Sequence, residues 1–135
     1  MIRLSLLAAL SGCAVACHAP AALACRCVPP ALAAAYEQAD AVAEVRIVAV
    51  SSPSADGSIS AEGEVVAAWK TRLPNPIRIV TGEDCAYPMK ANTIYLLYLS
   101  KGRDVWGTYE CRGNRVLGKA HAALHWLGRH GVSGG

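Results

Sequence analysis

The stretch Cys-Arg-Cys-Val-Pro-Pro, residues 25–30, is the part of the chain around which the rest is organised. It combines two closely spaced cysteines with a proline pair, and it follows directly on residues typical of a removable secretory leader. Cleavage after Ala24 would make Cys25 the first residue of the mature chain and give it an α-amino group. We therefore interpret the downstream sequence as a scaffold that holds this terminus in place.

Residues 1–24 are expected to be a secretory signal peptide. Arg3 supplies a short positive start, an apolar run follows from Leu4 to Ala16, and Ala22-Leu23-Ala24 is a small-x-small cleavage site. The run is too short for a membrane-spanning helix of roughly 20 residues. An alternative lies inside the leader, because Leu10-Ser11-Gly12-Cys13 resembles a bacterial lipoprotein processing site. Lipidation of Cys13 would place the chain at a membrane and leave the 25–30 stretch inside the chain.

The length predicts a single domain after the leader, and the charge balance argues against one class of partner. A leader of 24 residues out of 135 leaves 111, enough for a single modest core. We expect this domain at residues 25–130, with a flexible tail at 131–135. The whole chain has 13 basic and 10 acidic residues, and the basic residues are scattered. No basic run could follow a phosphate backbone, so nucleic acid is not an expected partner.

Four cysteines remain after the leader, namely Cys25, Cys27, Cys85 and Cys111. An even set in an exported chain predicts two disulfides in an oxidising compartment, and four cysteines allow three connectivities. A bond between Cys25 and Cys27 would close a strained ring. The residues therefore favour a pattern in which these two reach separately to Cys85 and Cys111, in either order.

Hydrophobic periodicity predicts an all-β fold with flanking helices. The clearest signal is the alternation from Ile59 to Trp69, which indicates one long strand with its apolar face inward, and Gly63 within it indicates a bulge or bend. The strand at 41–50 is expected to be covered on both faces near its end. Together, the predicted strands and bends indicate a five-stranded antiparallel OB-like barrel, closed or partly open. The expected elements are a helix at 31–39, strands at 41–50, 59–69, 77–81, 94–99 and 105–111, and a helix at 119–130.

The sequence does not favour an enzyme. No nucleophile elbow or Ser-His-Asp arrangement is visible, and the histidines after the leader lie only on the last helix. His121 and His125 have a spacing that can place two imidazoles on one metal, but no Cys, Asp or Glu follows to complete a site, so we interpret them as exposed helix residues. Trp69 and Trp126 are interpreted as core residues, whereas Trp106 falls on the outward parity of its strand.

The terminus at Cys25 has chemistry of a different kind. The amine and carbonyl of a first residue form a five-membered chelate that suits the open coordination position of a catalytic zinc. An α-amino group titrates at about pH 8 and so gives up its proton readily to bind a metal. Disulfides on both sides of this terminus would also reduce the entropy lost on binding.

These features occur together in a recognisable order. After the 25–30 stretch come the short helix to Ala39-Asp40, the strand Val45–Val50, Trp69-Lys70, Ile79-Val80-Thr81 leading to Cys85, Tyr95-Leu96-Leu97, and Cys111. In this combination the chain resembles the N-terminal domain of the tissue inhibitors of metalloproteinases, a netrin-like domain of the OB-fold superfamily. The resemblance covers roughly Cys25 to Cys111.

The resemblance implies a barrel in which Cys25 is bonded to Cys85 and Cys27 to Cys111. It further implies that the amine and carbonyl of Cys25 chelate the zinc of a target metalloprotease, so the chain has no cofactor of its own. Arg26 would occupy the primed-side specificity pocket of that target. The implied inhibitory ridge consists of Cys25, Arg26, Cys27 and Val28 together with Glu83, Asp84, Cys85 and Ala86.

The chain also departs from the family pattern. Arg26 replaces a small hydroxyl residue, and a long cation would be costly to desolvate in an apolar pocket, so Arg26 suits a pocket with an acidic base. The family's third disulfide in this domain and its C-terminal subdomain are absent. Alanine-rich composition and the Cys13 site suggest a bacterial single-domain relative. We expect a secreted, monomeric metalloprotease inhibitor, the alternative being a disulfide-stapled binding or structural module.

Overall fold

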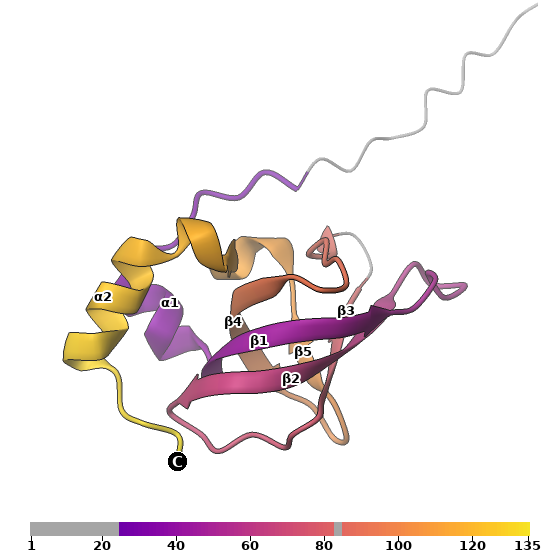
Figure 1. Ribbon diagram of the computed structural model, residues 1–135. Helices are drawn as coiled ribbons and strands as arrows, with labels where there is room; N and C mark the ends of the chain where they lie inside the picture. The colour runs from indigo at the N-terminus through magenta and orange to yellow at the C-terminus, as the bar shows by residue number, and fades with distance from the viewer. Residues whose placement is uncertain (1–24, 83–84) are drawn as a thin grey trace, which may run out of the picture.

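The structure is a computed structural model that describes residues 25–82 and 85–135 (Figure 1). The expected signal peptide at 1–24 and the alternative processing site at Cys13 lie outside the described residues. Among the described helices, none is both long and apolar enough to cross a membrane. A β-barrel forms the body of the fold, and two helices pack on one side of it.

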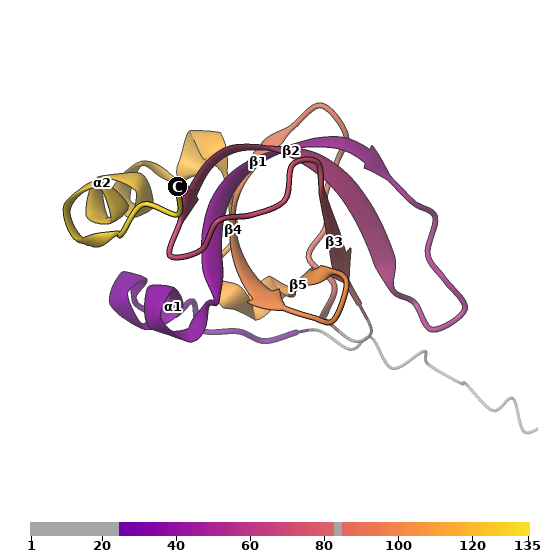
Figure 2. The same ribbon diagram turned by 90° about the horizontal axis from the view of Figure 1, so that it is seen from below.

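Five strands close into a barrel, as the sequence predicts. Around the ring the order is β1-β2-β3-β5-β4 and back to β1, and Figure 2 shows this closed arrangement. A two-residue strand, β6 (Arg115–Val116), also pairs with β4. The strands of the ring are β1 (Ala41–Val50), β2 (Ile59–Trp69), β3 (Ile77–Thr81), β4 (Ile94–Lys101) and β5 (Trp106–Thr108).

One pairing in the ring is parallel, which corrects the expectation of an antiparallel barrel. β3 runs parallel to β5, with Ile79 opposite Trp106 and Thr81 opposite Thr108. The other pairs in the ring are antiparallel. Strand directions would have to alternate around an all-antiparallel ring, and an odd number of strands cannot do so. A closed ring of five strands therefore contains at least one parallel pair, and this barrel is mixed.

Two β-bulges shift the alternation of β1 and β2. Val48 on β1 and Val66 on β2 are the extra residues where the register between the strands slips. Each bulge changes which side chains face inward, so Val50 and Ala68 pack against the interior beyond the bulges. Trp69 packs instead with the cluster beneath the helices. The prediction of one continuous inward face through Trp69 is therefore wrong beyond Val66.

The barrel interior holds the main hydrophobic core. Trp106 belongs to it and is only 8% exposed, so its expected outward position is wrong. β5 is a three-residue strand between β3 and β4, and its parity turns Trp106 and Thr108 inward. The buried interior residues are Ala41, Ala43, Val45, Ile47, Ala61, Ile77, Ile79, Met89, Tyr95, Leu97, Leu99 and Trp106.

The two helices cover the outer face of β1 and β4 (Figure 1). Val42, Leu96 and Tyr98 point outward from these strands and pack in a second cluster with Ala35 and Leu127 of the helices. This burial stabilises both helices more than their short lengths could by themselves. The helices are α1 (Leu32–Gln38) and α2 (His121–His130), and two 3-10 turns, η2 (Glu110–Arg112) and η3 (Leu117–Lys119), precede α2.

Helix packing buries both faces of β4, as its uninterrupted apolar run predicts. It also buries both faces of β1 at the start of the strand, where Ala41 and Val42 are 0% exposed, whereas Val48 near the end is 48% exposed. The expectation of double cover near the end of β1 is wrong, because the helices lie against its other end. The fifth strand ends at Thr108, earlier than predicted, since η2 follows it.

The segment 131–135, which the sequence predicts as a flexible tail, is part of the fold. Ser133 forms a bridge with Trp69 at the end of β2. The Gly134 N–H donates to the Ala68 carbonyl at 3.0 Å, and the Lys70 N–H donates to the Val132 carbonyl at 2.7 Å. These bonds cover backbone groups of β2 that its barrel partners leave unpaired at this end.

Replacing Gly63 with alanine is expected to destabilise the barrel by about 1–3 kcal/mol. A Cβ atom at this position would overlap the Val45 Cγ1 methyl group and lie 3.0 Å from the Arg46 carbonyl oxygen. Val45 is fully buried and has little room to move. Chemical denaturation measures the effect. Gly128→Ala in α2 is the matched control, because nothing lies within 4 Å of its Cβ and it should stabilise by about 0.5–1 kcal/mol. Equal effects of the two changes would contradict the close approach at Gly63.

Candidate functional site

The first described residues are tied to the barrel by two disulfides. Cys25 is bonded to Cys85 and Cys27 to Cys111, with Cα–Cα distances of 5.7 and 5.2 Å. This is the connectivity that the family resemblance implies. The bonds span 60 and 84 residues of sequence, so they attach two closely spaced residues to two segments that are distant along the chain. We call Cys25–Val28, together with Cys85 and Ala86, the terminal ridge.

Side chains of the terminal ridge alternate between the barrel and the solvent. Cys25 and Cys27 are partly buried, Arg26 is exposed, and Val28 is 91% exposed. The half-cystines thus hold the backbone against the fold while a cationic and an apolar side chain remain accessible. Glu83 and Asp84, the other residues expected here, lie outside the described residues.

Tyr87 fixes the loop that carries Cys85. Its backbone N–H donates to the Thr81 hydroxyl at 2.6 Å, at the last residue of β3. Its ring packs edge-on against Tyr95, with a centroid separation of 5.8 Å. Burial, with a smaller contribution from Tyr95, raises the pKa of Tyr87 to about 12, so the phenol is neutral at physiological pH. Tyr87 therefore holds the Cys85 side of the ridge by packing.

Arg112 fixes the 3-10 turn that carries Cys111. Its guanidinium donates to the Gln38 carbonyl of α1 at 3.1 Å and to the Ser100 hydroxyl of β4. The same group lies 4.9 Å from the centre of the Tyr109 ring. Cys27 is therefore bonded to a turn that is itself attached to both α1 and the barrel.

A polar network around Asn114 holds the chain after this turn, and no sequence pattern predicts it. Asn114 Oδ1 accepts from the Tyr98 N–H at 2.8 Å, and its amide donates to the Thr108 hydroxyl at 2.7 Å and the Tyr109 carbonyl at 3.0 Å. Thr108 in turn donates to the Tyr98 carbonyl at 2.9 Å. The sequence predicts a turn region at 114–118, but the pattern alone carries no sign of these partners.

α1 continues directly from the ridge and is fixed at its far end by Lys70. The ammonium group donates to the Tyr36 carbonyl at 2.7 Å and to the Ala39 carbonyl. It also lies 4.9 Å from the centre of the Tyr36 ring. A cation at these last carbonyls complements the helix dipole. The ridge is thus held through Cys85, through Cys111 and through α1.

The remaining candidates from the sequence are histidines and tryptophans outside the terminal ridge. His121, His125 and His130 are exposed, in agreement with their interpretation as surface helix residues. Within the described residues, no group of three or more His, Cys, Asp or Glu residues comes together, so no site with three or more protein ligands is present there. Trp69 and Trp126 pack against the cluster beneath the helices, as expected.

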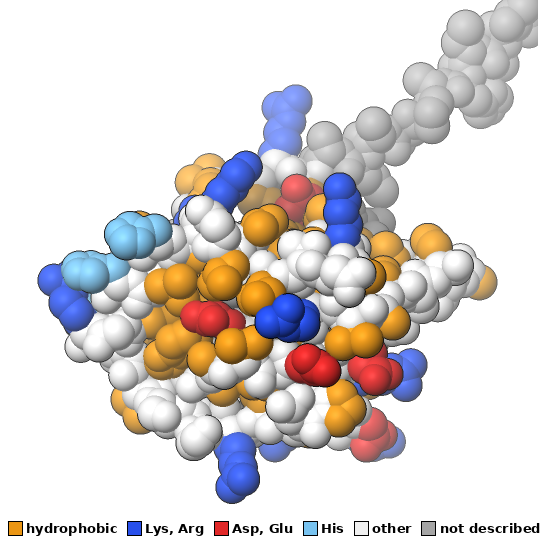
Figure 3. Space-filling view, in the orientation of Figure 1, with side chains coloured by type: hydrophobic (Ala, Val, Ile, Leu, Met, Phe, Trp, Pro, Cys, Tyr) orange, Lys and Arg blue, Asp and Glu red, His pale blue; other side chains and the backbone are white. Residues whose placement is uncertain are grey.

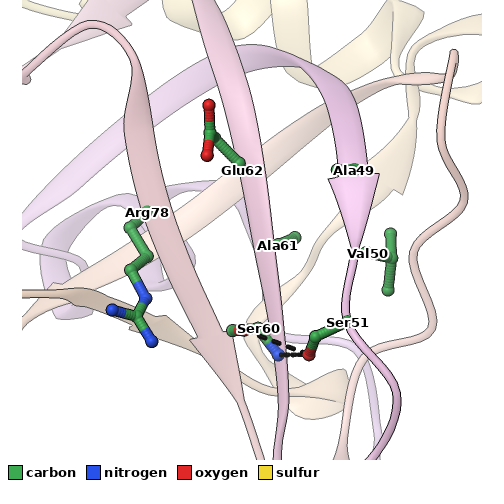
Figure 4. A pocket seen from close by; sticks show the side chains of 7 residues that line it. All are labelled: Ala49, Val50, Ser51, Ser60, Ala61, Glu62 and Arg78. Atoms are coloured by element: carbon green, nitrogen blue, oxygen red, sulfur yellow. Dashed lines mark hydrogen bonds between the residues drawn. The ribbon is translucent and has the colours of Figure 1, made fainter.

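A shallow hollow lies near the tip of the β1–β2 hairpin (Figure 4). The Ser60 N–H donates to the Ser51 hydroxyl at 2.9 Å, and the two hydroxyls lie 3.0 Å apart. Glu62 and Arg78 are register partners on β2 and β3, but their charged ends diverge in Figure 4. No histidine or cysteine lines this hollow, whose residues are Ala49, Val50, Ser51, Ser60, Ala61, Glu62 and Arg78.

Comparison of the chain with protein-family models and with curated proteins found no match. The fold and the ridge define the protein as a small mixed five-stranded β-barrel stapled by two disulfides. Disulfides of this kind are typical of proteins outside the reducing cytoplasm.

Proposed function

We propose that this protein is a secreted inhibitor of zinc metalloproteases whose mature chain begins at Cys25. In this proposal the Cys25 amine and carbonyl bind the catalytic zinc of the target at its open coordination position. The zinc belongs to the protease, and the inhibitor supplies no catalytic group. The terminal ridge is the surface that enters the active-site cleft.

The observation that carries the proposal is the double anchorage of the ridge. Cys25 and Cys27 are two residues apart, yet their disulfides lead to Cys85 beyond β3 and to Cys111 in η2. A terminus held in this way loses little conformational freedom on binding, which favours affinity. Stability alone could be met by disulfides anywhere in the fold, whereas an inhibitor needs them at the inserted end.

Exposure of Arg26 and Val28 supports the same surface. An apolar side chain that is 91% exposed loses unfavourable contact with water when a partner covers it. Arg26 gives the surface a charge that an acidic pocket would complement, because a buried guanidinium needs a carboxylate partner. The proposed targets are therefore metalloproteases with an acidic residue in the primed-side pocket next to the zinc.

The proposal is tested on the exported protein. Its intact mass should match a chain that begins at Cys25 and has lost four hydrogens to two disulfides. This form should inhibit a subset of a panel of zinc metalloproteases and leave serine proteases unaffected. A diacylglycerol on Cys13, or no effect on any member of the panel, would leave the protein as a disulfide-stapled binding or structural module.

Replacing Arg26 with threonine is expected to change selectivity by about tenfold or more between targets with acidic and apolar pockets. Loss of the cation removes its partner from an acidic pocket and removes a desolvation penalty from an apolar one. Inhibition constants against one protease of each kind measure the change. Arg103→Thr is the matched control, because Arg103 is an exposed arginine outside the ridge. If both variants behave alike, Arg26 does not enter the pocket.

A further inference from the structure

We propose that α2 carries a metal-binding site of this protein's own, formed by His121 and His125. Its ligand is a divalent transition metal that prefers imidazole, such as copper, nickel or zinc. The site is independent of the terminal ridge, where the proposed zinc belongs to the partner protease.

Helix geometry places the two imidazoles together. Residues four apart lie on the same face of an α-helix, with Cβ atoms about 5–6 Å apart, a spacing from which two histidines can bind one ion. Both side chains are exposed, and histidine gathers over α2 on the face shown in Figure 3. The helix that carries them is held to the barrel by the buried residues Ala123 and Leu127. The pair therefore sits on a fixed backbone and is open to solvent.

The third histidine of α2 is engaged elsewhere. The His130 ring stacks on Trp126, with centroids 4.7 Å apart and planes at 21°. Its Nδ1 atom lies 3.1 Å from the Trp126 carbonyl. Since the described residues contain no cluster of three metal-ligating side chains, a metal at His121 and His125 keeps open positions. Water, or a group from another molecule, completes its coordination.

Charge around the site limits its affinity and favours particular metals. Lys119 precedes the pair, Arg129 follows it by one turn, and no acidic residue occurs after Glu110. The first turn of a helix also carries positive partial charge. These charges oppose a bound cation, so the metals with the strongest intrinsic preference for imidazole should bind best, with copper ahead of nickel and zinc.

A metal at this position would stabilise the first turn of α2, which has no side-chain cap. The helix begins at His121, and its N-cap residue Ala120 provides no side-chain hydrogen bond to the first turn. A metal held by His121 and His125 bridges that turn to the next. Because the ion binds the folded helix and not the unfolded chain, metal should raise the thermal midpoint.

The test is titration of the disulfide-bonded protein with nickel chloride at pH 7.5, followed by calorimetry and thermal unfolding. We expect one equivalent to bind and the thermal midpoint to rise. His121→Gln and His125→Gln should each weaken binding by at least about tenfold, as loss of a ligand does in metal sites. His130→Gln is the matched control and should bind as the unchanged protein does.

A second control keeps the number of histidines and changes their spacing. The double variant Ala122→His with His125→Ala places two histidines at adjacent positions, which do not share a helix face. It should bind as weakly as the single variants. Undiminished binding by this variant, or equal losses in all three single variants, would overturn the site. Failure of the terminal ridge to inhibit any protease would leave this result unaffected.

Discussion

A form of the protein with one extra alanine before Cys25 is expected to inhibit its target at least about 100-fold more weakly, because a direct ligand of the zinc is lost. The added residue converts the Cys25 amine into an amide, whose nitrogen is not basic and does not bind zinc in place of a neutral amine. It also inserts a residue where the zinc must approach. Inhibition constants for the two forms, measured against one sensitive metalloprotease, give the ratio.

The control for this prediction separates the terminus from the fold. Both disulfides and the thermal midpoint should be the same in the two forms, since the added residue lies ahead of Cys25. Acetylation of the Cys25 amine should have the same effect as the extra alanine, because it removes the basic nitrogen with a smaller increase in bulk. Equal inhibition by the extended and the native form would show that Cys25 is not the zinc ligand.

Removal of the Cys27–Cys111 disulfide by replacing both cysteines with serine should lower the free energy of unfolding by roughly 2–5 kcal/mol. The bond spans 84 residues, so its loss releases a long loop in the unfolded chain. It also detaches the ridge from η2. Denaturant titration measures the stability, and the same samples report inhibition.

The inhibition measurement shows whether the Cys27–Cys111 disulfide serves stability alone or also inhibition. With Cys25–Cys85 intact, the ridge stays attached at one point but can move between Cys25 and α1. Inhibition should therefore weaken even at temperatures where the variant remains folded, because more freedom is lost on binding. A folded variant that inhibits as well as the native protein would mean that the Cys27–Cys111 bond serves stability alone.

Local patterns predicted much of the fold. The alternation in β2, the uninterrupted apolar run in β4 and the alanine-rich α1 are each visible within about ten residues, because strand and helix periodicities repeat over short distances. The cysteines likewise predicted a doubly stapled terminus, and the structure has Cys25 and Cys27 in separate bonds. The partners that hold the ridge were not predicted, since the Arg112 contact with Gln38 joins residues 74 apart.

The sequence by itself determined the number of barrel strands, the helix at each end and the disulfide-bound terminus, because these depend on local periodicity and on cysteine chemistry. Tertiary structure alone decided the parallel β3–β5 pair, the inward position of Trp106 and the docking of residues 131–135 on β2. Closure of a ring of five strands requires at least one parallel pair, and the packing of β5 between β3 and β4 makes β3–β5 that pair and turns Trp106 toward the core. The docking of residues 131–135 depends on which backbone groups at the end of β2 lack a partner strand. A local sequence pattern does not predict this.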